Sequence, residues 1–200
     1  PETFLNVIEI LNNGVDYYQS AGTPDSPGTK LFCLSGDIAR PGLYEAGFGI
    51  TLRDLLSDAG GVDGDLQAVL LGGAAGCFVG PEELDVPLTF EDTKANDLTL
   101  GSGAVMVFST KVNVPDVLGR LAEFFRDESC GQCVPCRIGT VRQHEVLLQI
   151  GDGKANKDQL SLLHDIDTVM TDASICGLGQ TAASAVRSAI TLGLLGETRS

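Results

Sequence analysis

The sequence predicts an α+β protein in which a small mixed sheet with one packed helix is followed by an all-helical part. Between residues 29 and 110 the apolar residues form short runs that end at glycine or at a Pro-Gly pair, which is typical of strands and turns. After residue 111 the apolar residues recur at intervals of three and four, which is typical of helices packed on one another. Because 43% of the residues are hydrophobic, the chain can bury a core in both parts.

The first part is predicted element by element. Residues 3–20 carry an apolar stripe at helical spacing that is interrupted at Gly14, and a loop rich in Gly and Pro follows. One helix is expected between the N-cap Thr51 and the terminating Gly60. The acidic residues 82–97 are predicted to be mostly loop. Strands are predicted at residues 30–36, 43–46, 67–73 and 104–109. One helix on a mixed sheet of this order is the arrangement of a β-grasp fold.

The second part is predicted to be a four-helix unit. Its four apolar faces lie within residues 117–125, 141–150, 160–170 and 182–195. The connectors at residues 151–158 and 171–179 have lengths that are usual between bundle helices. The expected domains are therefore residues 1–28 as a helical segment with a linker, 29–110 as the β-grasp domain and 111–200 as the helical domain.

Charge and hydropathy exclude several classes of function. The chain has 27 acidic and 13 basic residues and a net charge of −14, so it repels phosphate backbones and anionic membrane surfaces. The longest uncharged apolar run, residues 68–80, is broken by glycines and is too short to cross a bilayer. The N-terminus carries acids where a signal peptide is basic, and it lacks Met. We expect a cytoplasmic protein that is part of a longer polypeptide, with no nucleic-acid partner and no membrane insertion.

Three of the six cysteines are crowded into the stretch ESCGQCVPCRIGT, at Cys130, Cys133 and Cys136. Positions three and six apart on a straight helix point in different directions, so convergent thiolates require a chain that curls around a common centre. Gly131 allows the backbone to approach closely, and Pro135 fixes φ and disfavours simple helix at Val134. Mutual disulfides are geometrically awkward at this spacing, so a metal centre is predicted.

The fourth ligand is expected in the stretch SICGLGQ, where Cys176 follows Cys136 by forty residues. Two helices between them can return the chain to the first three thiols. The spacing C-x2-C-x2-C-x39-C supplies the four thiolates that a [4Fe–4S] cluster requires.

Zinc is the alternative metal. In that case the chain would be a zinc-stapled β-grasp module with a binding or structural function. Structural zinc sites usually combine two paired knuckles, and His144 and His164 lie in helical stretches away from a second knuckle, so the pattern favours the cluster. Cys33 and Cys77 are predicted to be buried free thiols.

Arg137, which follows the third cysteine, has two open interpretations. In the first, it donates to cluster sulfur or to a carboxylate and so raises the cluster potential. In the second, it forms a structural ion pair with Glu128 or Asp127.

The stretches ESCGQCVPCRIGT and ICGLGQTAA resemble the NADH-oxidising flavoprotein subunits related to the complex I NADH-binding subunit. This family includes the diaphorase subunits of NAD-reducing hydrogenases and of NAD-dependent formate dehydrogenases. The stretch GTKLFCLSGDIARPGLYE resembles the family's SLBB (soluble-ligand-binding β-grasp) domain, and ETFLNV resembles the end of its NNVET motif, which closes the flavin domain.

The resemblance implies an NADH dehydrogenase or diaphorase type of oxidoreductase. Family members exchange hydride with NAD(H) at FMN, which exchanges single electrons with a [4Fe–4S] cluster. By position the cluster ligands are Cys130, Cys133, Cys136 and Cys176. Leu178 and Gly179 are implied to border the flavin, and residues 1–28 to be a helical remnant of the flavin domain. The implied partners are this preceding domain and the iron–sulfur subunits of a hydrogenase, formate dehydrogenase or complex I-like assembly.

Three departures from the family pattern bear on what is expected of these residues. The glycine-rich motif of the family's flavin and nucleotide site does not occur in the sequence, so the 200 residues alone are not expected to bind NADH or to be catalytic. The proline that often follows the fourth cysteine is replaced within Ala183-Ser184-Ala185-Val186. Gln132 stands where complex I members often have an aromatic residue, which favours the hydrogenase or formate dehydrogenase branch.

Overall fold

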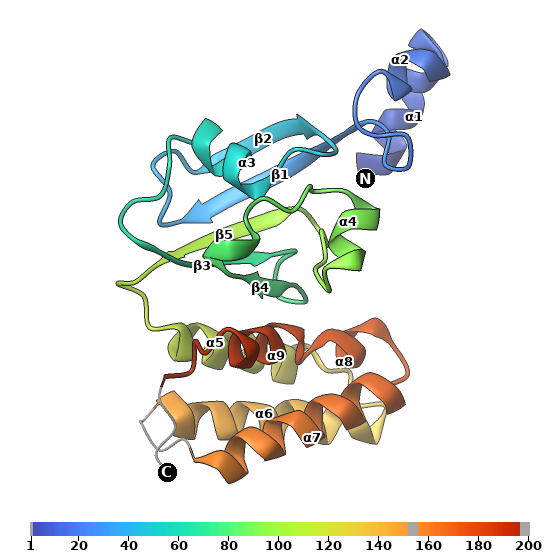
Figure 1. Ribbon diagram of the computed structural model, residues 1–200. Helices are drawn as coiled ribbons and strands as arrows, with labels where there is room; N and C mark the ends of the chain where they lie inside the picture. The colour runs from blue at the N-terminus through green and yellow to red at the C-terminus, as the bar shows by residue number, and fades with distance from the viewer. Residues whose placement is uncertain (1, 152–155, 197–200) are drawn as a thin grey trace.

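The computed structural model describes residues 2–151 and 156–196. Two small helices at the N-terminus lie to one side of a mixed sheet, and a layer of helices lies against the opposite face of that sheet from α3 (Figure 1). The N-terminal half contains, in order, α1 (Glu2–Asn13), α2 (Val15–Gln19), β1 (Thr29–Gly36), β2 (Gly42–Gly47), α3 (Leu52–Asp58), β3 (Leu66–Leu71), β4 (Cys77–Val79), the 3-10 helix η1 (Pro81–Glu83), α4 (Phe90–Ala95) and β5 (Ala104–Ser109). The helical half contains α5 (Val114–Glu128), α6 (Val134–Gly151), α7 (Lys157–Ala173), α8 (Gly177–Thr181) and α9 (Ser184–Thr191).

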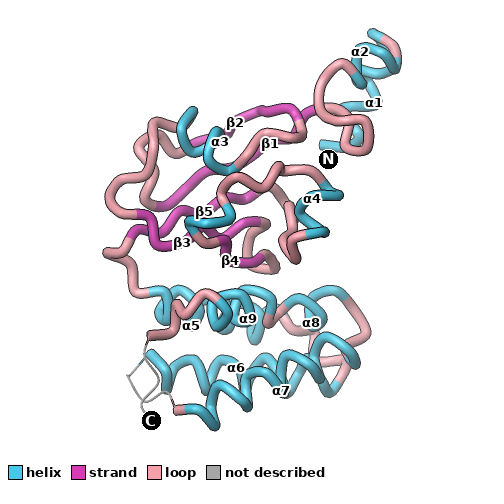
Figure 2. The backbone as a smooth tube through the Cα atoms, in the orientation of Figure 1, coloured by secondary structure: helices cyan, strands magenta, loops and turns pink. Residues whose placement is uncertain are grey.

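The five strands have the order β2-β1-β5-β3-β4. The central pair, β1 and β5, is parallel, and the other three pairs are antiparallel. The end of β1 is tied to β5 by Asp37, whose carboxylate accepts hydrogen bonds from both Ser109 N (2.9 Å) and Ser109 Oγ (2.6 Å). The mixed sheet followed by helices confirms the predicted α+β class (Figure 2).

Each face of the sheet buries its own set of side chains, because successive residues of a strand point to opposite faces. Val69 and Val107 belong to a core that α3 closes through Leu52 and Leu55. Thr51 caps α3 as predicted, with its hydroxyl accepting a hydrogen bond from Asp54 N.

The other face of the sheet shares a core with the helical half. Ala68, Leu70 and Phe108 pack in one cluster with residues of α5, α6 and α9, including the fully buried Leu118 and Ala189. The hydrophobic interior is therefore continuous across the predicted domain boundary at residue 110.

Two contacts fix the helical half. Gly139 lies so close to α7 that a Cβ there would come within 2.6 Å of the Met170 sulfur, so α6 and α7 pack tightly at this point. Ser188 of α9 accepts a hydrogen bond from Phe78 N (2.8 Å), which joins α9 to β4.

The N-terminal helix α1 leaves its apolar side chains uncovered. None of its described residues is buried, and Phe4 and Leu11 are 81% and 80% exposed. Glu2 connects it to the sheet by accepting a hydrogen bond from Leu31 N (2.8 Å). Among the described helices, none combines the length and apolar character needed to cross a lipid bilayer.

The structure differs from the prediction in three places. The acidic residues 82–97 are not mostly loop, because they contain the end of η1 and the helix α4, which Thr89 caps by accepting from Asp92 N. The short strand β4 was not predicted. The short helix α8 begins inside the predicted connector at residues 171–179, and the fourth predicted helix corresponds to α9. Residues 152–155 of the predicted connector and 197–200 of the predicted helical domain lie outside the described residues.

Candidate functional site

The first three cysteines lie where α5 gives way to α6. Gly131 has a φ of +73°, a conformation that favours glycine, and it lets the chain reverse between the two helices. Pro135 was expected to disfavour simple helix at Val134, but α6 begins at Val134. Proline is tolerated in the first turn of a helix, where its missing N–H would have no intrahelical partner.

These three thiols have different surroundings. Cys130 is exposed and Cys133 is half-buried, whereas Cys136 lies in the first turn of α6 and is only 5% exposed. The Cys133 carbonyl accepts the hydrogen bond from Arg137 N (3.0 Å), so Cys133 occupies the N-terminal end of α6. Ser129 Oγ lies 3.3 Å from Cys136 Sγ at hydrogen-bonding distance.

Cys176 lies at a second helix junction, between the end of α7 and the start of α8. It is the N-cap residue of α8, and its side chain is exposed. The segment before it contacts the first cysteine loop, because the N–H groups of Ile175 and Cys136 donate to Cys133 and hold the pKa of its thiol below its usual value. The two cysteine-bearing segments, forty residues apart in sequence, therefore meet in space.

Gly179 brings the same two segments into contact at a second point. A Cβ at this position would come within 2.9 Å of Cys136 Cβ and 2.6 Å of Ser174 Cβ. Only glycine therefore allows α8 to approach the first turn of α6 so closely. Gly179 is buried, and its neighbour Leu178 packs in the cluster that contains Phe125 and Met170.

The donor set and its surroundings fit an anionic thiolate-ligated centre. Thiolates are soft ligands suited to iron–sulfur clusters and zinc. The N-terminal end of α6 places its partial positive charge beside Cys133, and the N–H groups aimed at that sulfur stabilise negative charge. Within residues 2–151 and 156–196, no group of three or more Cys, His, Asp or Glu side chains lies together closely enough to hold a metal ion. The assignment of all four cysteines as ligands of one centre thus stays a prediction.

The described contacts of Arg137 do not include the predicted ion pair with Glu128 or Asp127, and its alternative role toward cluster sulfur stays a prediction. Its Nη1 donates to the carbonyl of Gly131 (3.1 Å), which closes the cysteine loop onto α6. The carboxylate of Asp127 pairs instead with Arg126 (2.8 Å). Arg137 therefore shapes the loop through a main-chain contact.

Among the described residues, the remaining two thiols and the two histidines have other surroundings. The prediction that Cys33 is buried is wrong, because it points to the opposite face of β1 from the fully buried Phe32 and is exposed. Cys77 is buried as predicted, and burial raises the pKa of its thiol. His144 is buried against Arg126, whose Nη1 lies 2.9 Å from its Nδ1, and His164 is exposed.

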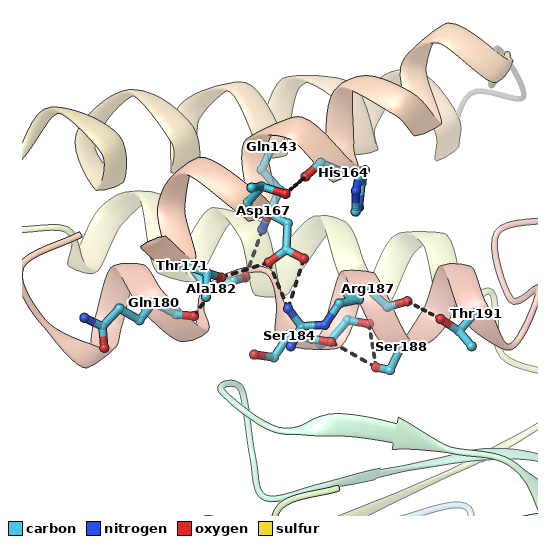
Figure 3. A network of polar contacts seen from close by, with 12 residues as sticks. Gln143, His164, Asp167, Thr171, Gln180, Ala182, Ser184, Arg187, Ser188 and Thr191 are labelled. Atoms are coloured by element: carbon cyan, nitrogen blue, oxygen red, sulfur yellow. Dashed lines mark hydrogen bonds and ion pairs between the residues drawn. The ribbon is translucent and has the colours of Figure 1, made fainter. Parts of the chain in front are cut away.

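A polar network that the sequence did not reveal joins α7 to α9. Asp167 of α7 accepts hydrogen bonds from Arg187 Nη1 of α9 at 3.1 and 3.0 Å, and from Thr171 Oγ1 at 3.1 Å (Figure 3). The Asp167 side chain is 10% exposed and that of Arg187 is 55% exposed. The sequence signal for this network was the acidic residue Asp167, which lies within the apolar stripe that contains Leu163, Ile166 and Met170.

Two family descriptions match the chain. Residues 30–107 match the SLBB domain, and residues 116–192 match the NADH-ubiquinone oxidoreductase-F iron–sulfur binding region.

Individual relatives cover nearly the whole chain. The NADP-reducing hydrogenase subunit HndC of Solidesulfovibrio fructosivorans is 38% identical over 94% of this chain, and the F-type subunit of the NADH-quinone oxidoreductase of Mycobacterium tuberculosis is 39% identical over 94%. The chain spans only 39% and 43% of the length of these two relatives. A crystal structure of an NAD+-reducing [NiFe]-hydrogenase in the H2-reduced state superposes with a TM-score of 0.90 at 37% identity, over 99% of this chain and 34% of that chain.

Proposed function

We propose that this chain, which belongs to the family of F-type NADH-oxidoreductase subunits, conducts single electrons between an NAD(H)-linked flavin and partner iron–sulfur proteins. The chain is homologous to the C-terminal SLBB and [4Fe–4S]-binding region of that family. The proposed ligands are Cys130, Cys133, Cys136 and Cys176. Such a cluster, when bound, supplies a centre that accepts and releases one electron at a time.

One observation carries the proposal: two cysteine-bearing segments meet at a pair of helix starts. The contact of Gly179 with Cys136 and that of Ile175 N–H with Cys133 both join the first three thiols to the segment of the fourth. If the cysteines were only free thiols of the core, the two segments would have no reason to approach so closely that Gly179 has no room for a Cβ.

The residues around the thiols have separate tasks. Cys136 anchors one side of the centre in the interior, where it is shielded from water. Arg137 holds the loop through Gly131, and the N–H groups at Cys133 stabilise negative charge on sulfur. Exclusion of water and hydrogen bonding to sulfur are the two means by which a protein sets the potential of such a centre.

The iron–sulfur interpretation is favoured over zinc by the family match of residues 116–192, which is to an iron–sulfur binding region. The described residues add no CxxC pair separate from residues 130–136 and no pair of histidines to the site, because His144 is buried against Arg126 and His164 lies on a different helix.

The finer parts of the proposal concern the flavin. We propose that FMN and NAD(H) bind to sequence outside these residues, and that Leu178 and Gly179 border the gap between flavin and cluster. The uncovered apolar face of α1 supports the proposal that residues 1–28 complete a flavin domain, because Phe4 and Leu11 require a covering surface. Residues 29–110 and 111–200 are then the SLBB and cluster domains of one continuous body.

The proposed partners are the iron–sulfur subunits of a hydrogenase, formate dehydrogenase or complex I-like assembly, and the proposed compartment is the cytoplasm. Relatives named as subunits of such enzymes support the partners. Six cysteines with no disulfide among the described residues support a reducing compartment.

The proposal is tested on the full-length protein purified without oxygen. We expect a brown protein whose broad visible absorption is bleached by dithionite, with about four irons and about four sulfides per chain. In the same protein, NADH should reduce the cluster. A colourless protein with stoichiometric zinc would contradict the cluster, and a cluster that NADH never reduces would contradict the electron path.

A further inference from the structure

Ser174 is a buried hydroxyl whose oxygen finds no hydrogen-bond partner among the described residues. The residue is 6% exposed and caps the C-terminal end of α7. Its main chain is fully bonded, since its N–H donates to the Met170 carbonyl (3.2 Å) and its carbonyl accepts from Gln180 Nε2 (3.0 Å). Its Oγ is nevertheless unpartnered. Burying a hydroxyl without a partner is costly, so such an atom indicates a group that the polypeptide itself does not supply.

The hydroxyl lies inside the cysteine site. A Cβ at Gly179 would collide with Ser174 Oγ and would also come within 2.9 Å of Cys136 Cβ, so the hydroxyl and the third cysteine share the space that this glycine leaves. The Ser174 hydroxyl also approaches the Cys133 thiol without reaching hydrogen-bonding distance. The orphan oxygen therefore faces two of the proposed ligands.

Neighbouring hydroxyls behave differently. Thr140 Oγ1, which is fully buried, donates to the carbonyl of Cys136 (2.8 Å), and Ser129 Oγ is already engaged with Cys136 Sγ (3.3 Å). Thr171 Oγ1, on the turn of α7 before Ser174, bonds Asp167. Ser174 is thus the hydroxyl at this site that remains free to donate.

We propose that Ser174 Oγ donates a hydrogen bond to sulfur of the bound iron–sulfur centre and thereby raises its reduction potential. This inference rests on the proposed function and assigns Ser174 a role in setting the reduction potential of the cluster. Reduction adds negative charge to the sulfur atoms, and a hydrogen bond to a more negative acceptor is stronger. The hydroxyl therefore stabilises the reduced state more than the oxidised state.

The test compares reduction potentials in the full-length protein, with two pairs of side chains that differ in the hydroxyl. The wild type is compared with Ser174→Ala, and Ser174→Thr is compared with Ser174→Val, whose side chains have the same shape. Each protein is titrated with dithionite and followed by EPR of the reduced cluster. We expect the variant without the hydroxyl to be about tenfold harder to reduce in each pair, a shift of about 59 mV for one electron.

The Thr and Val pair keeps the inference testable when loss of packing alone affects Ser174→Ala. The matched control is Thr168→Ala, which removes an exposed hydroxyl of α7 that donates to the His164 carbonyl. The reduction potential of the cluster in this variant should equal that in the wild type. Equal potentials within both pairs, with the cluster at full occupancy, would overturn the role of Ser174 and leave the proposed function intact. A wild-type protein without a cluster would overturn both.

Discussion

Replacing Arg187 with Met should destabilise the protein by about 2–3 kcal/mol, because the change leaves the carboxylate of Asp167 buried without its cationic partner. Met keeps most of the aliphatic volume of arginine, so the loss reports on charge and hydrogen bonding.

The magnitude follows from the geometry of the pair. Removing one partner of a buried ion pair costs about 3–5 kcal/mol. The Asp167 side chain is 10% exposed, which places it near this limit, but Arg187 is 55% exposed and solvent screens part of its charge. Thr171 Oγ1 continues to donate to the carboxylate at 3.1 Å, which leaves one of its bonds in place. These two corrections lower the expected cost to about 2–3 kcal/mol.

Guanidinium-induced unfolding followed by far-UV circular dichroism at neutral pH measures the effect. The double variant Asp167→Leu with Arg187→Met should recover much of the lost stability, because it removes the buried charge together with its partner. The matched control is Arg53→Met, which breaks a similarly close pair with Asp85 (2.6 Å) whose side chains are 54% and 68% exposed.

The control should leave the free energy of unfolding nearly unchanged, because both of its charges remain in water. Equal losses for Arg187→Met and Arg53→Met would refute the reasoning that burial of Asp167 sets the cost. If the double variant loses as much free energy of unfolding as the two single variants together, the direct coupling of Asp167 with Arg187 is refuted.

Three further predictions concern the site and the fold. Cys176→Ala should lower the bound iron and acid-labile sulfide, whereas the exposed Cys33→Ala should not; iron at full stoichiometry in Cys176→Ala would remove it from the ligand set. Hydrogen bonds from Ser109 hold the pKa of Asp37 below 3.8 in the folded protein. The contribution of the Asp37 carboxylate to the free energy of unfolding is therefore complete above about pH 4 and is lost as the pH falls through the folded-state pKa. Asp37→Asn should therefore cost about 1 kcal/mol at neutral pH and flatten the acid limb of a stability–pH curve, and an unchanged limb would count against it. Gly139→Val should lower the melting temperature by overpacking the contact with α7, at a cost of about 1–3 kcal/mol; an unaltered melting temperature would show that α7 can move aside.

The elements with strong periodicity were predictable from the sequence. The strands β1, β2, β3 and β5 and the helices α5 to α7 were found because their apolar residues repeat over several turns or residues. The helix α4 was missed because its acidic composition hid the capping pattern in which Thr89 binds Asp92. The exposure of Cys33 was missed because β1 is a continuous apolar run, in which period alone does not show which face is covered.

The site was predictable as a set of residue types and only partly as a structure. The spacing of the cysteines and the resemblance of the surrounding motifs indicated the family, which the two family matches confirm. The contact of Gly179 with Cys136 and the position of Ser174 depend on where α7 returns the chain. The hydrogen bond from Arg137 to the Gly131 carbonyl is local but depends on one loop conformation. Neither kind of contact can be read from the spacing of residues in the sequence.

The hydrogen bond between Ser188 and Phe78 has a consequence for the solubility of the sheet. Strand β4 lies at one edge of the described sheet, and an open edge is a template for pairing with another chain. Helix α9 blocks this edge, and the helical half also covers Ala68, Leu70 and Phe108. A fragment cut at residue 110 would expose both the edge and an apolar face, so it should aggregate when expressed alone. The cluster-binding half therefore also protects the sheet from aggregation, and the two halves need to be produced as one piece.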